Sequence, residues 1–179
     1  MDSKINIKNI VSIALMTSVL CVISPFQIII PMSIVPVSLA SFGIYLIVYI
    51  MGLKKGIISV LLYVLLGFIG LPVFTGFSGG VVKVLGPTGG YIIGYIFLAL
   101  IEGIFVDRFK KMWLKILGMI IGTIVLYLFG TIWLAYQSKM TFVSALYAGV
   151  IPFIFGDTIK IIIAVLLGDK IKMALSQGK

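Results

Sequence analysis

Long stretches without ionisable side chains constrain the fold of this chain more than any other feature of its sequence. In residues 10–23 and 114–136 charged groups are absent or stand only near the edges. Each stretch approaches the roughly 20 apolar residues that a helix needs to cross a bilayer. Only 11% of the 179 residues are charged, too few to cover a soluble globule. Because the runs have the length of helices rather than strands, the sequence predicts an all-α membrane protein.

Six transmembrane helices are expected, within a single domain that covers residues 1–179. They lie at about 9–30, 36–53, 56–70, 87–106, 113–137 and 143–167. Eleven of the 14 Lys and Arg residues fall on one side of this arrangement, while Lys83 and Lys139 fall on the other and Lys160 lies inside a span. By the positive-inside rule, both termini are therefore expected in the cytoplasm.

The composition disfavours several classes of function. The chain has no histidine and a single cysteine, Cys21, so the usual metal sites are not expected and no cofactor is predicted. The basic residues collect in short runs between apolar stretches, as in loops beside a membrane, and not on one face as in proteins that bind nucleic acid. Membrane lipid is the surrounding medium that such a sequence requires.

The most unusual segment is the Gly-rich loop at residues 70–90, GLPVFTGFSGGVVKVLGPTGG, which the predicted topology puts on the extracellular side between helices three and four. Glycine permits positive φ angles and close backbone approach. With apolar anchors such as Phe74 and Phe77, the loop is either a shaped lid over a site or a tight re-entrant turn that links two helices.

The end of this loop has the features of a helix start. Pro87 is expected as the first residue of the fourth helix, which would leave backbone N–H groups free at Thr88, Gly89 and Gly90. With Lys83 nearby, such a turn would receive an anionic or carbonyl group, or would simply lie at the membrane interface.

Asp157 and Lys160 are the charged residues that the predicted spans tolerate least, three positions apart in an apolar run. Burying either charge alone at the bilayer centre costs about 2.5 to 3.5 kcal/mol on insertion scales. The pair is therefore either a structural ion pair or a binding site, in which the carboxylate accepts and the ammonium donates, as an amide or urea group requires. Pro152, five residues before the pair, predicts a kink beside it.

Two further features concern the other helices. Ala14 and Ser18 form a small-xxx-small pair on the first helix, which suits either internal packing or contact with a partner protein. Glu102 is expected at the cytoplasmic interface, close to Asp107 and a basic cluster, with no role in ligand binding.

Together these motifs resemble the BioY family, the biotin-binding S components of energy-coupling factor (ECF) transporters. The resemblance rests on GLPVF and GPTGGY in the Gly-rich loop, on the proline-marked segment at 35–39, and on the aspartate and lysine of the sixth helix. It covers nearly the whole chain and implies a transport subunit of a prokaryotic plasma membrane, not an enzyme. Where many relatives have Thr and Gln entering helix two, this chain has Ser38 and Ala40, so a hydroxyl is kept and an amide is lost.

The resemblance also implies a site and a partner. Asp157 and Lys160 would hold the ureido head of biotin while the Gly-rich loop closes over it. The other substrate-binding candidates are Ser38, Phe74, Gly79, Gly80, Lys83, Thr88, Gly89 and Tyr91. The implied partner is an ECF module, with a transmembrane coupling protein and two ATPases, that docks on Ala14 and Ser18. The chain itself has no GxxxxGK[ST] loop for ATP.

Other interpretations remain open at this point. An S component for another vitamin, such as riboflavin or thiamine, would share the same architecture. An intramembrane enzyme would use Asp157 as a base and Ser38 or Thr88 as a nucleophile, without a histidine or a recognisable Ser-Lys arrangement to support it. A structural or assembly protein would need the charged pair only for stability.

Overall fold

The computed structural model describes residues 7–28 and 36–177, which form helices and one short antiparallel ribbon. The elements are α1 (Ile7–Ile23), β1 (Gln27–Ile28), β2 (Val37–Ser38), α2 (Ala40–Phe68), α3 (Val81–Leu85), α4 (Gly89–Arg108), α5 (Met112–Gln137), α6 (Phe142–Gly149) and α7 (Ile151–Gln177). The predicted all-α fold is confirmed. Parts of two sequence predictions, the end of the first span at 29–30 and the start of the proline-marked segment at 35, lie outside the described residues.

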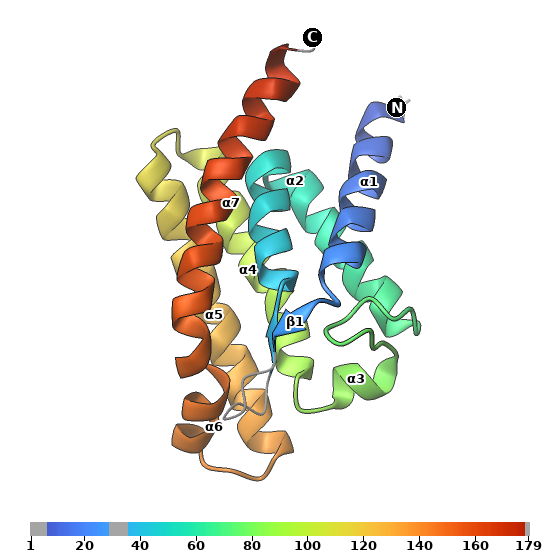
Figure 1. The fold of residues 1–179 in the computed structure, drawn as a ribbon, viewed down its shortest axis with the longest axis vertical. Helices are drawn as coiled ribbons and strands as arrows, with labels where there is room; N and C mark the ends of the chain where they lie inside the picture. The colour runs from blue at the N-terminus through green and yellow to red at the C-terminus, as the bar shows by residue number, and fades with distance from the viewer. Residues whose placement is uncertain (1–6, 29–35, 178–179) are drawn as a thin grey trace, which may run out of the picture.

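The long helices form one bundle with α4 as its most buried member. The α4 helix packs on α5 and α2, while α1 and α7 both pack on α2. In Figure 1, the N-terminal end of α1 and the C-terminal end of α7 lie at the same end of the bundle, with α3 and α6 at the opposite end. The β1–β2 ribbon lies between these two ends, where Gln27 pairs with Ser38.

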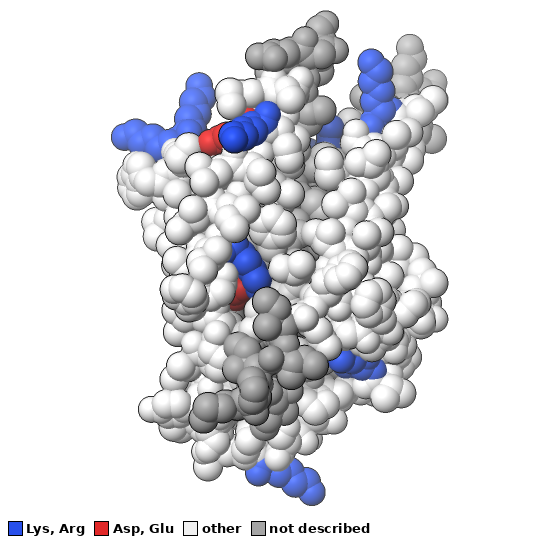
Figure 2. Space-filling view, viewed as in Figure 1, with Lys and Arg blue, Asp and Glu red and all other residues white. Residues whose placement is uncertain are grey.

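Four of the described helices are long and apolar enough to cross a membrane: α2, α4, α5 and residues 151–174 of α7. The α1 helix is also apolar but has 17 residues. In Figure 2, Lys and Arg side chains gather at the end of the molecule that carries the termini, and the flank of the bundle is largely free of charge. Such a surface suits hydrocarbon along the flank and lipid headgroups or water at the charged end.

The α2 helix contains both the second and third predicted spans. In place of the expected loop at residues 54–55, a break at the single residue Gly52 (φ 75°, ψ −175°) divides it. The two halves run in different directions in Figure 1. A carboxylate oxygen of Asp107 accepts the N–H of Leu53 at 3.1 Å, so α4 caps the start of the second half. Because glycine adopts this φ angle easily, the single residue Gly52 can change the direction of the chain between the two halves of α2.

The sixth predicted span is also divided. The α6 helix ends at Gly149, Val150 leaves helical geometry, and α7 begins at Ile151 with Pro152 in its first turn. A proline there has no N–H to contribute to the preceding helix, so the chain restarts rather than bends. The kink predicted beside the charged pair is thus confirmed as a complete break between two helices.

Glu102, which the sequence predicts at the cytoplasmic interface, packs inside the bundle. Its side chain is fully buried on α4, and neither carboxyl oxygen has a hydrogen-bond partner among the described residues. The basic cluster after Asp107 marks the end of the helix correctly, but Glu102 lies more than one turn earlier, on the face that packs into the bundle.

Candidate substrate-binding site

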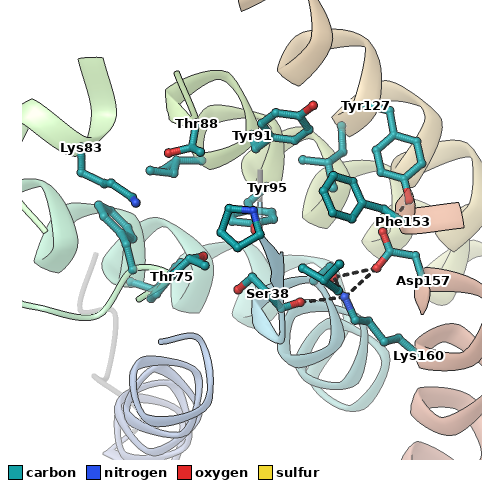
Figure 3. A pocket seen from close by; sticks show the side chains of 17 residues that line it. Ser38, Thr75, Lys83, Thr88, Tyr91, Tyr95, Tyr127, Phe153, Asp157 and Lys160 are labelled. Atoms are coloured by element: carbon teal, nitrogen blue, oxygen red, sulfur yellow. Dashed lines mark hydrogen bonds and ion pairs between the residues drawn. The ribbon is translucent and has the colours of Figure 1, made fainter. Parts of the chain in front are cut away.

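A cavity of about 50 Å³ lies among α2, α4, α5 and α7, next to the Gly-rich loop and the β2 strand (Figure 3). Aromatic side chains form much of its wall: Tyr63, Phe74, Tyr91, Tyr95, Tyr127 and Phe153. Its polar lining residues are Ser38, Ser41, Thr75, Lys83, Thr88, Asp157 and Lys160. An apolar wall with a few converging polar groups is the usual make-up of a small-molecule site.

The predicted pair of Asp157 and Lys160 lies at one end of this cavity, and both side chains are buried. The Lys160 Nζ atom is 2.7 Å from Asp157 Oδ1. The same ammonium donates to the Ser38 carbonyl oxygen at 2.7 Å and to the Ser41 hydroxyl at 3.1 Å. Three elements, α2, β2 and α7, therefore hold one cation in the interior of an apolar bundle.

The carboxylate of Asp157 has further donors on its other side. The Ser41 hydroxyl donates to Oδ1 at 3.1 Å, and the Tyr127 hydroxyl of α5 donates to Oδ2 at 2.6 Å. Because a carboxylate offers about four lone-pair positions, three donors leave one acceptor position for a ligand. The charge of Asp157 is thus compensated from α2, α5 and its own helix.

Ser38 contributes through its backbone and not through the hydroxyl that the sequence drew attention to. Its hydroxyl donates to the Ser24 carbonyl oxygen and accepts the N–H of Ala40, both at 3.0 Å. These bonds fix the turn from the ribbon into α2 and point the Ser38 carbonyl at Lys160. Ala40 is fully buried and does not line the cavity.

Lys83 lies at the opposite end of the cavity from the Asp157–Lys160 pair, with its amino group pointing inward (Figure 3). It is half-buried on the short helix α3, and this burial lowers the pKa of its ammonium from the usual 10.5. The indole N–H of Trp133 donates to the Gly86 carbonyl at 2.9 Å and so ties the end of α3 to α5. The site therefore has a donor–acceptor pair at one end and a cation at the other.

Phe74 and Tyr91 line the cavity, and each also holds elements together. The Phe74 ring is 1% exposed, packs edge-on against Tyr63 at 5.5 Å, and covers Gly67. The Tyr91 hydroxyl donates to the Gly149 carbonyl oxygen at 2.9 Å, which links α4 to α6. The single donor of the Tyr91 hydroxyl is therefore already used within the bundle.

Three predicted glycines, Gly79, Gly80 and Gly89, do not line the cavity. The N–H of Gly80 donates to the Gly67 carbonyl at 2.7 Å, and φ is +86° at this residue. The expectation of a free N–H at Gly89 is wrong, because this group donates to the Gly86 carbonyl at 3.0 Å in the turn before α4. These glycines shape the loop, and at the start of α4 the cavity is lined by Thr88 and Tyr91 instead.

A second, larger cavity of about 470 Å³ opens between α5 and the α6–α7 pair. Its walls are mostly apolar, and Tyr127 and Asp157 are the two residues that line both cavities. Although it is larger, it lacks Lys83, Lys160 and the serines, so the smaller cavity is the candidate site. Within the described chain, no group of three or more His, Cys, Asp or Glu side chains is placed to hold a metal.

On α1, Ala14 and Ser18 are both exposed in the described chain, while Thr17 and Leu20 face α2. The Ser18 hydroxyl donates to the Ala14 carbonyl at 2.9 Å within the helix. The small-residue pair therefore does not mediate packing between α1 and the rest of the described chain.

Ser41 and Tyr127 are the main site residues that sequence reasoning missed. Their contacts with Asp157 span 116 and 30 positions, so no local pattern reveals them. One signal was present: Ser38 and Ser41 are three residues apart, the same spacing as Asp157 and Lys160, at the start of an apolar span. A tyrosine hydroxyl inside a predicted span also needs a partner, which was a signal for Tyr127.

Comparisons with known proteins identify the family of the chain. Residues 1–177 match the model of the BioY family. The chain is 34% identical to the biotin transporter BioY2 of Lactococcus lactis over 92% of this chain and 90% of that one. It is 40% identical to a probable biotin transporter BioY of Pyrococcus horikoshii over 77% of this chain and 81% of that one.

A solved structure has the same fold. The crystal structure of the S component for biotin from an ECF-type ABC transporter superposes with a TM-score of 0.87 and 30% sequence identity, over 97% of this chain and 95% of that one. A family match over nearly the full length, relatives above 30% identity and a shared fold lead to one conclusion. The chain belongs to the BioY family.

Proposed function

We propose that this protein is the biotin-capturing S component of an ECF-type vitamin transporter, a transport subunit and not an enzyme. The observation that carries the proposal is the buried Asp157–Lys160 pair at one end of an aromatic-lined cavity, in a chain that belongs to the BioY family. The structural relative is described as an S component for biotin.

The chemistry of biotin matches the two ends of the cavity. The ureido ring presents two N–H donors and one carbonyl acceptor, which suit the Asp157 carboxylate and the Lys160 ammonium. The valerate tail ends in a carboxylate, which suits Lys83 at the opposite end. Tyrosine and phenylalanine rings between these ends would pack against the apolar part of the ligand.

Entry of the ligand requires the walls of the cavity to separate. The cavity of about 50 Å³ is smaller than the roughly 300 to 1,000 Å³ of typical small-molecule sites. The Gly-rich loop is the wall with the best hinges, since Gly70, Gly76 and Gly80 all have positive φ angles. We assign this loop the role of a lid whose anchor in the bundle is Phe74.

For the topology, the proposal keeps six membrane spans: α1, the two halves of α2, α4, α5 and α7. Both termini then lie in the cytoplasm and the Gly-rich loop is extracellular. Support comes from the break at Gly52, from the shared end of α1 and α7 in Figure 1, and from the positive charge at that end in Figure 2.

The proposed partner is an ECF module, made of a transmembrane coupling protein and two ATPases. The structural relative is the S component of an ECF-type ABC transporter, and the sequence itself contains no phosphate-binding loop, so any ATP hydrolysis would come from the partner. The exposed Ala14–Ser18 face of α1 is the proposed docking surface, since small residues let another helix approach closely.

Direct binding tests the proposal. Calorimetry with the purified protein in detergent should give saturable binding of biotin, with riboflavin and thiamine as comparison ligands. Asp157→Asn is the matched site variant and should weaken biotin binding at least tenfold. No response to biotin, together with a response to another vitamin, would assign the chain to that vitamin instead.

A further inference from the structure

Ser41 occupies a special place between the two charged residues of the site. Its hydroxyl accepts a hydrogen bond from Lys160 Nζ at 3.1 Å and donates one to Asp157 Oδ1 at 3.1 Å, while Lys160 and Asp157 contact each other directly at 2.7 Å. The three side chains form a closed triangle, and Ser41 is buried at 5% exposure on the first turn of α2.

The hydrogen-bonding capacity of Lys160 is fully used by this arrangement. An ammonium has three N–H donors. They go to the Ser38 carbonyl, to Asp157 and to Ser41. A ligand carbonyl can therefore bind Nζ only by replacing one of these acceptors.

Ser41 is the acceptor with the weakest hold on Lys160. The hydrogen bonds of Ser41 to Lys160 and to Asp157 are both 3.1 Å long. The bonds from Lys160 Nζ to the Ser38 carbonyl and to Asp157 are both 2.7 Å long. Longer charge-assisted bonds are weaker. The Ser38 carbonyl is also fixed by the backbone of β2, but a serine hydroxyl can turn away by rotation about χ1.

The Ser41 hydroxyl also has the same pattern as the ligand head: one donor that faces the carboxylate and one acceptor that faces the ammonium. We propose that Ser41 is a specificity-determining placeholder, whose hydroxyl holds the Asp157–Lys160 pair in its binding geometry until the N–H and C=O of a urea or amide group replace it. This inference rests on the proposed function for the name of the ligand, and on the Ser41–Asp157–Lys160 triangle for the mechanism.

Exchange of this kind selects the ligand. A group that offers only a carbonyl would free the Ser41 hydroxyl from Lys160 but leave the Asp157 acceptor without a replacement donor. A group with only N–H donors would leave one Lys160 donor unpaired if it displaced Ser41, and without that exchange it could fill only the fourth acceptor position of Asp157. Each omission leaves a buried polar group unsatisfied, which costs about 1 to 3 kcal/mol in binding. Only a ligand with adjacent donor and acceptor restores both bonds.

The placeholder makes an unusual prediction about Ser41→Ala. Removal of the hydroxyl leaves the pair without its third member, so the thermal unfolding midpoint measured without biotin should fall. The ligand then no longer has to displace Ser41, so the Kd for biotin measured by calorimetry should fall about five- to tenfold. Loss of stability together with tighter binding is a combination that a merely structural serine would not give.

Ser59→Ala is the matched control. Ser59 is a fully buried serine on the same helix, and its hydroxyl donates to the Lys55 and Ile13 carbonyls, away from the cavity. Its Kd for biotin should match that of the wild type. As a second probe, an analogue with an imino group in place of the ureido carbonyl is a guanidinium cation at neutral pH and offers Lys160 no acceptor, so Ser41→Ala should not tighten its binding at that pH.

The outcomes separate the two proposals. If the wild-type chain does not bind biotin, the proposed function fails. If the wild type binds biotin and Ser41→Ala binds it equally or more weakly, the placeholder role is wrong and Ser41 is either neutral or a direct ligand contact. Should Ser41→Ala not fold, Ser41→Cys replaces it, because a thiol is a weak donor and a weak acceptor and should shift Kd in the same direction by a smaller factor.

Discussion

The buried ion pair allows stability and binding to be measured separately through a double-mutant cycle of Asp157→Asn and Lys160→Met. Each single variant leaves one buried charge without its partner at 2.7 Å. In Lys160→Met the carboxylate keeps donors from Ser41 and Tyr127, and in Asp157→Asn the ammonium keeps the Ser38 carbonyl and Ser41. Breaking a buried pair in this way costs about 3 to 5 kcal/mol of unfolding free energy.

A chain of this size loses about 2 to 4 °C of melting temperature per kcal/mol, so each single variant should melt roughly 6 to 20 °C lower than the wild type. The double variant removes both charges and should recover part of this loss, because no unpaired charge remains. Binding should behave differently: all three variants should bind biotin at least about tenfold more weakly, since a lost hydrogen bond to a charged group costs about 1.5 to 3 kcal/mol.

The assay combines fluorescence-monitored thermal unfolding in detergent with calorimetric titration of biotin. Lys170→Met, at an exposed position on the same helix, is the control and should change neither quantity. The reasoning is refuted if the single variants keep wild-type affinity, or if the double variant restores affinity along with stability, because the pair would then be a structural element alone.

Three variants and one pH titration test other parts of the molecule. Lys83→Gln should weaken binding of biotin about tenfold but leave binding of neutral biotin amide unchanged in calorimetry. Only the protonated amine of Lys83 attracts a carboxylate, so wild-type affinity for biotin should fall as the pH rises through the Lys83 pKa. Because burial lowers this pKa, the fall should come at a lower pH than for an ordinary lysine. Binding of the amide should show no such fall. Gly67→Ala places a methyl group against the Phe74 ring, so the anchor of the Gly-rich loop must shift, and both melting temperature and biotin affinity should drop, with about 1 to 3 kcal/mol lost. Gly52→Ala meets a positive φ and a carboxylate oxygen of Asp107, so it should lower the melting temperature by an amount equivalent to about 1 to 3 kcal/mol while leaving the Kd for biotin unchanged.

The fold class was predictable because it depends on hydrophobic run length, which is a local property of the sequence. The position of Pro152 predicted the disruption beside the charged pair for the same reason, since the missing N–H acts within one turn. The boundary between the second and third spans was placed within two residues of Gly52, but the absence of a loop there depends on Asp107, which is distant in sequence. Local signals therefore located the elements, and contacts between distant residues decided how they join.

For the site as well, local signals in the sequence were readable and contacts between distant residues were not. Asp157 and Lys160 were conspicuous because charges are costly in an apolar helix, and their contact spans three residues. Glu102 is also a charged residue in an apolar helix, but its charged neighbours in the sequence led to a prediction at the interface, whereas its side chain is fully buried. Ser41 and Tyr127 were missed because hydroxyl groups are common in membrane helices and only the fold brings these two to Asp157.

The Ser38 carbonyl has a consequence for genetic screens. Lys160 donates to the main-chain carbonyl at this position, and every amino acid supplies such a carbonyl. An alanine scan would remove the Ser38 hydroxyl and report the loss of its bonds to Ser24 and Ala40, but it would leave the contact with Lys160 in place. One of the closest neighbours of the Lys160 ammonium is thus invisible to side-chain mutagenesis, and an ester in place of the Ser38–Leu39 peptide bond would be needed to weaken the Ser38 carbonyl as an acceptor.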